Sequence, residues 1–140
     1  MTPAQIALVQ SSLPAVLANG ETAAKLFYTR LFEIDPSVRR LFARVDIDQQ
    51  GMKLLTAIAM VVGSLDRFEV VEREIRALAR RHVGYGVTYL HYQSVGAALL
   101  WTLGEVLGGA FTPELRRAWA AAYRTVSDTM QGAVTSTLAA

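Results

Sequence analysis

The chain has 140 residues, of which 52% are hydrophobic and 19% are charged, and its formal net charge is +2. This length suits one domain with a substantial core, and the scattered basic residues give no strong field that favours nucleic acid. The absence of cysteine excludes disulfides, thiolate metal sites, iron–sulfur clusters and covalently attached haem.

The first half of the chain has the periodicity of amphipathic helices. A helix is expected over 2–20, and Pro14 inside it predicts a kink or a break. A second helix is expected over 21–33, followed by a short helical turn over 35–42. A polar connector then leads to a third long helix, which is expected over 49–65.

The second half continues the helical pattern almost to the end of the chain. Helices are expected over 66–82, then up to Gly108, and then from Pro113 onward. Residues 132–140 are small and weakly patterned, which predicts a short C-terminal tail after a single domain over 1–131. Because no hairpin signal or sustained alternation predicts a strand, the expected fold is all-α, with six or seven helices.

The helix over 66–82 carries a histidine where its pattern requires an apolar residue. Its apolar stripe repeats at steps of three, four and three through Phe68, Val71, Ile75 and Leu78. The next step of four reaches His82, at the inner face of the helix end. Such an imidazole is either a buried polar residue with a local partner or a ligand to something enclosed by the fold. On the stripe alone, the first interpretation is the more common one.

Several other chemistries find no support in the residues. Two histidines are too few for a multi-histidine zinc or copper site, and no serine lies in a nucleophile-elbow context. A single inward imidazole facing an apolar interior suits one axial bond to a haem iron. His91 is the rival ligand, and it lies outside the stripe of His82.

Three residues ahead of His82 favour the ligand hypothesis. Tyr28 and Gln50 are polar residues on otherwise apolar helix faces, and Phe42 ends the short helical turn. Each has an ordinary explanation, because Tyr28 could bond a backbone carbonyl, Gln50 could start a helix and Phe42 could belong to the core. Their joint occurrence in this order favours a site opposite the histidine.

In this order and spacing the chain resembles the bacterial single-domain globins, which are similar to the haem domain of flavohaemoglobins. The likeness runs from about Ile6 to Met130 and implies a globin fold around a haem pocket. The matching residues are Leu26-Phe27-Tyr28, Leu31-Phe32, Phe42, Gln50, Leu54, Arg80-Arg81-His82, Tyr85-Gly86-Val87, His91-Tyr92, Val95, Leu99, Trp119 and Tyr123.

The resemblance implies non-covalently bound haem b, with His82 as the ligand of the iron. It implies that Tyr28 and Gln50 are the catalytic residues, as hydrogen-bond donors that stabilise bound dioxygen by about 1–3 kcal/mol each. Arg81 would pair with a haem propionate, although an ordinary surface cation remains nearly as good an explanation. The residues that the resemblance assigns to cofactor binding are Phe42, Leu54, Arg81, Val87, Tyr92, Val95 and Leu99.

The chain departs from the flavohaemoglobin pattern in two respects. In that pattern the proximal histidine donates to a tyrosine–glutamate pair. Tyr92 is present, but Val134 occupies the aligned glutamate position, with no carboxylate nearby. We therefore expect weaker electron donation from the histidine to the iron, which would make oxygen–oxygen bond cleavage and peroxidase-like activity less favourable. We expect catalytic turnover to need a separate electron donor, because the residues show the globin resemblance alone and no flavin or nicotinamide reductase pattern.

The leading hypothesis is a haem-binding globin that takes up O2, NO and CO and oxidises nitric oxide to nitrate when an external reductase is present. The alternatives are a sensor or carrier without turnover and, more remotely, a helical interaction module without haem. Residues 2–20 lack a signal-peptide pattern and no segment is apolar enough to span a bilayer. We expect a cytoplasmic protein with no nucleic-acid or membrane partner. The sequence does not indicate the oligomeric state. It also leaves open whether Gln50 or Tyr28 coordinates ferric iron directly.

Overall fold

The computed structural model describes residues 1–84 and 87–139, with the side chains of 84 and 134–139 left out. Within this part of the chain the structure is helical and contains no strand, which confirms the all-α expectation. The α-helices are α1 (Pro3–Ala18), α2 (Gly20–Ile34), α3 (Ile47–Gly63), α4 (Phe68–Gly84), α5 (Tyr89–Leu107) and α6 (Pro113–Ala139). Three short 3-10 helices connect them, namely η1 (Pro36–Phe42), η2 (Leu65–Arg67) and η3 (Gly108–Ala110).

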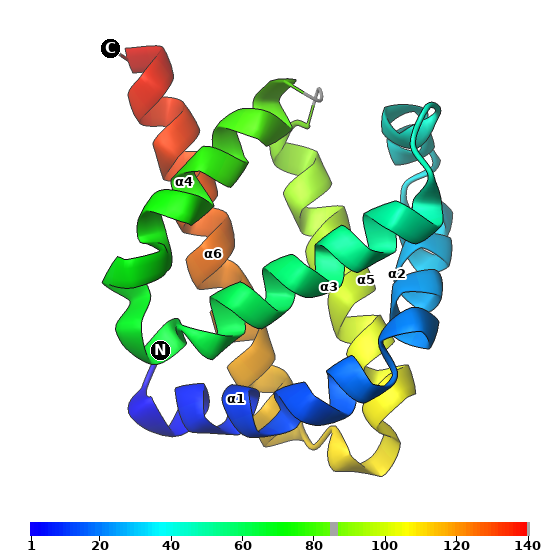
Figure 1. Cartoon of the computed structure of the whole chain (residues 1–140), viewed down its shortest axis with the longest axis vertical. Coiled ribbons are helices and arrows are strands. Elements are labelled where there is room, and N and C mark those ends of the chain that lie inside the picture. The colour runs from blue at the N-terminus through cyan, green and yellow to red at the C-terminus, as the bar shows by residue number, and fades with distance from the viewer. Residues whose placement is uncertain (85–86, 140) are drawn as a thin grey trace.

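The helices pack as crossed pairs rather than as a parallel bundle (Figure 1). Helix α2 packs on α5, α4 packs on α6, and α1 lies across the lower end of the molecule, where it contacts α6. Helix α3 runs across the view, and the part of α3 near its own start contacts α2. No helix among the described residues is long and apolar enough to cross a membrane.

Side-chain caps determine where several helices begin. The Thr2 hydroxyl accepts a hydrogen bond from the Gln5 backbone N–H at 3.1 Å, and the Gln5 side chain accepts one from the Thr2 N–H at 2.9 Å. The Asp46 carboxylate accepts a hydrogen bond from the Asp48 N–H at 3.0 Å. Helix α3 therefore begins at Ile47, two residues before its expected start.

Of the kink or break expected at Pro14, the break is wrong, because α1 continues through this residue to Ala18; the kink stays a prediction. Pro14 is exposed, so water can bond the carbonyl that loses its intrahelical partner. The expected end of α5 is confirmed at Gly108, whose φ of +57° suits a residue without a side chain. Helix α6 continues to Ala139, so residues 132–139 extend this helix, and the division of the chain after 131 stays a prediction.

Two clusters of buried residues form the core. The first joins α1, α3, α4, α5 and α6 and includes Ile75 of the predicted stripe, which is fully buried. Two long-range hydrogen bonds reinforce it. The Trp119 indole N–H donates to the Ser12 hydroxyl at 2.9 Å, and the Gln10 amide donates to the Val62 carbonyl at 3.0 Å. The second cluster consists of Phe27, Tyr28, Leu31, Val38 and Ala98, with further apolar side chains packed against it.

A close contact between α2 and α3 positions the residues of the second cluster. A Cβ added at Gly51 would lie 2.8 Å from the Cβ of Ala24, and one added at Gly20 would lie 2.8 Å from Cδ1 of Leu55. Gly51 follows Gln50, and Ala24 lies one helical turn before Tyr28. The missing side chains therefore let α3 approach α2 closely enough to bring Gln50 beside Tyr28.

Candidate functional site

Tyr28 is a buried phenol on the inner face of α2, with 4% of its surface exposed. Its hydroxyl lies 3.5 Å from the Gln50 backbone carbonyl, which is a long distance for a hydrogen bond. Burial raises the pKa of the phenol to about 12, while a hydrogen bond with the Gln50 side chain lowers this pKa by a smaller amount. Tyr28 therefore remains a protonated donor at neutral pH, with only a weak tether to the backbone.

Phe42 reaches the ring of Tyr28 from the end of η1. The two ring centroids are 5.4 Å apart, and the planes are inclined by 67°, an edge-to-face contact. The start of η1 is held by Asp35, whose carboxylate accepts hydrogen bonds from the Ser37 N–H at 3.1 Å and from the Ser94 hydroxyl at 3.3 Å. Since Ser94 belongs to α5, this contact ties the segment that carries Phe42 to the centre of the fold.

Gln50 and Leu54 occupy successive turns of α3 and are both half-buried. Leu54 packs against the second cluster together with Val95 and Leu99 of α5. Five residues that the sequence predicts for the site thus meet in one apolar region, namely Tyr28, Phe42, Leu54, Val95 and Leu99.

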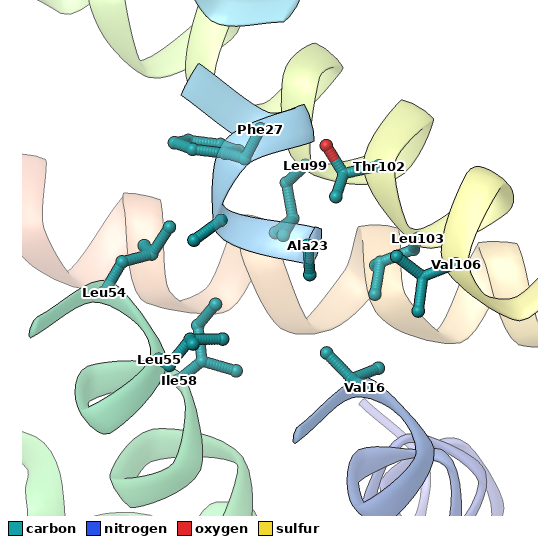
Figure 2. Close-up of a pocket in the computed structure, with 11 residues that line it drawn as sticks. Val16, Ala23, Phe27, Leu54, Leu55, Ile58, Leu99, Thr102, Leu103 and Val106 are labelled. Atoms are coloured by element: carbon teal, nitrogen blue, oxygen red, sulfur yellow. The ribbon is translucent and has the colours of Figure 1, made fainter. Parts of the chain in front are cut away.

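Leu54 and Leu99 also line a small cavity between α1, α2, α3 and α5 (Figure 2). Its described walls are apolar except for the hydroxyl of Thr102, which donates to the Ala98 carbonyl at 2.8 Å. This side of the site therefore offers no spare polar group to a molecule in the cavity.

His82 lies near the end of α4, half-buried, and its Nδ1 is 2.8 Å from the Leu78 carbonyl. A carbonyl can only accept, so Nδ1 carries the proton and the neutral ring has its lone pair on Nε2. Burial lowers the pKa of the imidazole, as does the neighbouring Arg81, while the bond to Leu78 raises it. A neutral imidazole in this tautomer has the donor atom that a haem iron requires.

The residues around His82 differ in their environment. Val87 is half-buried, and its N–H donates to the His82 carbonyl at 3.1 Å, so the start of the next segment stays beside the histidine. Arg81 is exposed, which fits both a propionate partner and a surface cation. Tyr85 and Gly86, which contribute to the sequence resemblance, lie outside the described residues.

Tyr92 is half-buried in α5, and burial raises the pKa of its phenol. Its backbone carbonyl accepts a hydrogen bond of 2.5 Å from the hydroxyl of Tyr123 on α6. The ring of Tyr123 lies against Gly96, where an added Cβ would be 2.7 Å from Cε2 of the ring. The side chain of Val134, which the sequence aligns with a glutamate, is outside the described part of the chain.

His91 has a local structural partner. Its Nδ1 accepts a hydrogen bond of 2.9 Å from the Thr88 N–H, as part of a capping box at the start of α5. No group of three or more His, Cys, Asp or Glu residues that could hold a metal ion occurs within residues 1–84 and 87–139.

Phe32 contributes to the site, although the sequence analysis assigned it no role there. Its ring centroid is 6.2 Å from that of Tyr28 and 5.7 Å from that of Phe42. The signal was its position one turn after Tyr28 on α2. Gly51 was also missed; a glycine inside a helical pattern, away from any turn, indicates a close approach of two helices.

Comparisons with known proteins agree with this arrangement. The Globin family model matches residues 25–130. A flavohemoprotein of Bordetella pertussis is 37% identical over 134 residues, which cover 94% of this chain and 33% of that protein. A flavohemoprotein of Deinococcus radiodurans is 34% identical with the same coverage. The chain thus spans about a third of the length of these relatives.

Two solved structures have nearly the same fold. A bacterial globin from Campylobacter jejuni superposes with a TM-score of 0.88 at 26% identity, covering 99% of this chain and 100% of that one. An engineered carbene transferase from Rhodothermus marinus, described as a candidate nitric oxide dioxygenase, superposes with a TM-score of 0.86. It is 29% identical, and the match covers 100% of this chain and 99% of the other.

Proposed function

The chain belongs to the globin family, and we propose that it is a haem protein that binds dioxygen reversibly and, with electrons from a separate reductase, oxidises nitric oxide. The observation that carries the proposal is that one globin fold presents two groups suited to the two faces of a haem. A neutral imidazole with its lone pair on Nε2 is present at His82, and a buried phenol with a long hydrogen bond is present at Tyr28. The family implies a haem cofactor, and haem b is the form that we propose.

The residues present fit a haem group. We propose that His82 would hold the haem iron, because its Nδ1 bonds the Leu78 carbonyl and Nε2 then carries the lone pair. Apolar side chains of this chain would enclose the porphyrin, and Arg81 would meet a propionate. The proposed enclosing residues are Phe42, Leu54, Val87, Val95 and Leu99, with Tyr92 behind the histidine.

Haem supplies an iron atom that binds diatomic gases on its open side and changes its oxidation state. Tyr28 would donate a hydrogen bond from its protonated hydroxyl to such a ligand, and the Gln50 amide would donate a second one. Because Tyr28 is buried, its bond forms in a medium of low dielectric and is stronger than in water. Phe42 and Leu54 would exclude water, which limits oxidation of the iron.

For nitric oxide the proposed reaction is dioxygenation. One nitric oxide and one dioxygen combine to nitrate, and one electron per turnover returns the cofactor to its starting oxidation state. The similarity to flavohemoproteins, and to a structure described as a candidate nitric oxide dioxygenase, supports this class of reaction. We propose a reductase as a separate partner and a cytoplasmic location, which co-purification and cell fractionation would test.

A carrier or sensor is the second candidate function. No carboxylate occurs in residues 132–140, where flavohaemoglobins are expected to have the glutamate that pairs with the tyrosine. Weaker electron donation through the histidine favours holding dioxygen over breaking its bond.

Absorbance and product analysis separate these functions. The purified protein, reconstituted with haem, should have a strong porphyrin band and should bind O2 and CO; no such band would contradict every haem function. Mixing with nitric oxide in the presence of dioxygen should give nitrate in a single turnover, and repeated turnover with an added reductase. Gas binding without nitrate would favour the carrier or sensor.

A further inference from the structure

Three aromatic rings surround the ring of Tyr28. Phe27 lies 5.0 Å away at an angle of 79°, Phe42 lies 5.4 Å away at 67°, and Phe32 lies 6.2 Å away at 36°. The hydroxyl contact with Gln50, by comparison, is 3.5 Å long. Packing of the ring therefore contributes to the direction of the hydroxyl, together with the contacts that Gln50 makes with it.

Phe32 connects two elements that hold this ring. It lies on α2, one turn after Tyr28, and its ring also contacts Phe42 of η1 at 5.7 Å. Phe27, on the other side, is itself 4% exposed and is fixed in the second cluster. Phe32 is only half-buried, as is Phe42, so these two rings form the part of the ring enclosure that is nearer the surface.

Arg39 covers Phe32 from outside. Its guanidinium carbon is 5.6 Å from the centroid of the Phe32 ring, within the range of a cation–π contact. Arg39 belongs to η1, as does Phe42, so this cation and this ring, which both contact Phe32, come from one short segment. The resulting chain of contacts runs from the surface cation through Phe32 to the buried phenol.

We propose that Phe32, held by Arg39, is a positioning residue that fixes the direction of the Tyr28 hydroxyl and so sets how slowly a diatomic ligand leaves. The proposal rests on the function proposed above. A smaller side chain at 32 leaves a gap beside the Tyr28 ring. Since the hydroxyl is at the far end of that side chain, a small tilt moves it out of line with the ligand.

The test compares Phe32→Leu and Arg39→Gln with wild type in the haem-loaded protein. The rate of oxygen dissociation should rise about five-fold in Phe32→Leu and about two-fold in Arg39→Gln, as expected for the loss of one ring contact and one exposed cation–π contact. Arg39 is on the surface, so its variant tests the proposal even where Phe32→Leu folds poorly. Phe111→Leu, a half-buried phenylalanine of the first cluster, is the matched control and should leave the rate unchanged.

A spectroscopic signature separates positioning from a general loss of stability. A hydrogen bond from Tyr28 lowers the stretching frequency of bound CO, so Phe32→Leu should shift or split this infrared band toward that of Tyr28→Phe. In the Tyr28→Phe background, Phe32→Leu should change neither the band nor the dissociation rate. An unchanged band in Phe32→Leu, or an equal effect in the double variant, would overturn the proposal.

The same experiment distinguishes failure of the proposed function. If wild type binds neither haem nor CO, the proposed function fails and the positioning proposal fails with it. If wild type binds CO but Tyr28→Phe has the same band and rate, Tyr28 is not the donor and the positioning proposal fails, while the haem function stands. If Tyr28→Phe differs from wild type while Phe32→Leu does not, only the positioning role of Phe32 is wrong.

Discussion

Gly51 and Ala24 bring α3 and α2 close together, since a Cβ on Gly51 would lie 2.8 Å from the Cβ of Ala24. This contact is one residue from Gln50 and one turn from Tyr28. The relative position of the two proposed ligand donors therefore depends on a glycine that has no chemical role of its own.

Gly51→Ala should destabilise the protein even though alanine is the better helix former. Overpacking lowers the free energy of unfolding by roughly 1–3 kcal/mol, and the higher helix propensity of alanine raises it by about 1 kcal/mol. We therefore expect the free energy of unfolding to fall by about 1 kcal/mol. Urea denaturation measures this change. Gly63→Ala is the control, because nothing lies within 4 Å of its Cβ position at the end of the same helix. Equal stabilisation in both variants would contradict the close contact.

Tyr123→Phe should lower the free energy of unfolding by about 1 kcal/mol, because it removes one hydrogen bond to the Tyr92 carbonyl. Gly96→Ala should cost more, since its Cβ would lie 2.7 Å from the Tyr123 ring. Chemical denaturation of both variants tests the ranking. A larger loss in Tyr123→Phe than in Gly96→Ala would mean that packing at Gly96 matters less than the hydrogen bond.

Tyr28 should make the free energy of unfolding depend on pH in the alkaline range. Its pKa is raised from 10.0 to about 12 in the fold, so folding favours the neutral phenol. The stability that Tyr28 contributes is fully present below pH 10 and is lost as the pH rises through about 12. Two pKa units correspond to roughly 2–3 kcal/mol.

Wild type and Tyr28→Phe, unfolded with urea at a series of pH values, provide the comparison. Wild type should lose more stability over this alkaline range than Tyr28→Phe, which has no phenol at this position. Parallel curves for the two proteins would contradict a strongly buried phenol.

His82→Ala should lose haem, because it removes the proposed ligand, and free imidazole should restore the porphyrin absorbance. His91→Ala is the matched control, since its Nδ1 bonds the Thr88 N–H at the start of α5. This variant should keep haem and lose about 1 kcal/mol of stability with the helix cap. Loss of haem in His91→Ala, with haem retained in His82→Ala, would show that His91 and not His82 is the ligand of the iron.

Periodicity was sufficient to predict the helices, because a helix depends on residues a few positions apart, and His82 at the end of the predicted stripe is half-buried. Periodicity did not predict how α1 tolerates a proline or where α3 begins. Pro14 is tolerated because it is exposed, and α3 begins early because Asp46 caps it. The Asp46 cap was readable from sequence, whereas the exposure of Pro14 depends on how α1 packs.

The site was harder to predict because it joins distant elements. Sequence resemblance proposed Tyr28 and Phe42 for the site, but their edge-to-face contact depends on the position of η1, whose start is capped by Asp35. The position of Gln50 depends on the crossing of α2 and α3, which no periodicity specifies. Phe32 was missed because an apolar residue on a helix gives no sign of which neighbour it holds.

The dissociation of oxygen from Tyr28→Phe, followed by stopped flow beside wild type, tests the central claim most directly. Tyr28 is proposed as a buried donor to the ligand, and its loss should remove a bond worth about 1–3 kcal/mol. We predict a rate at least about five-fold faster than that of wild type. An unchanged rate in a variant that still binds haem would contradict the account.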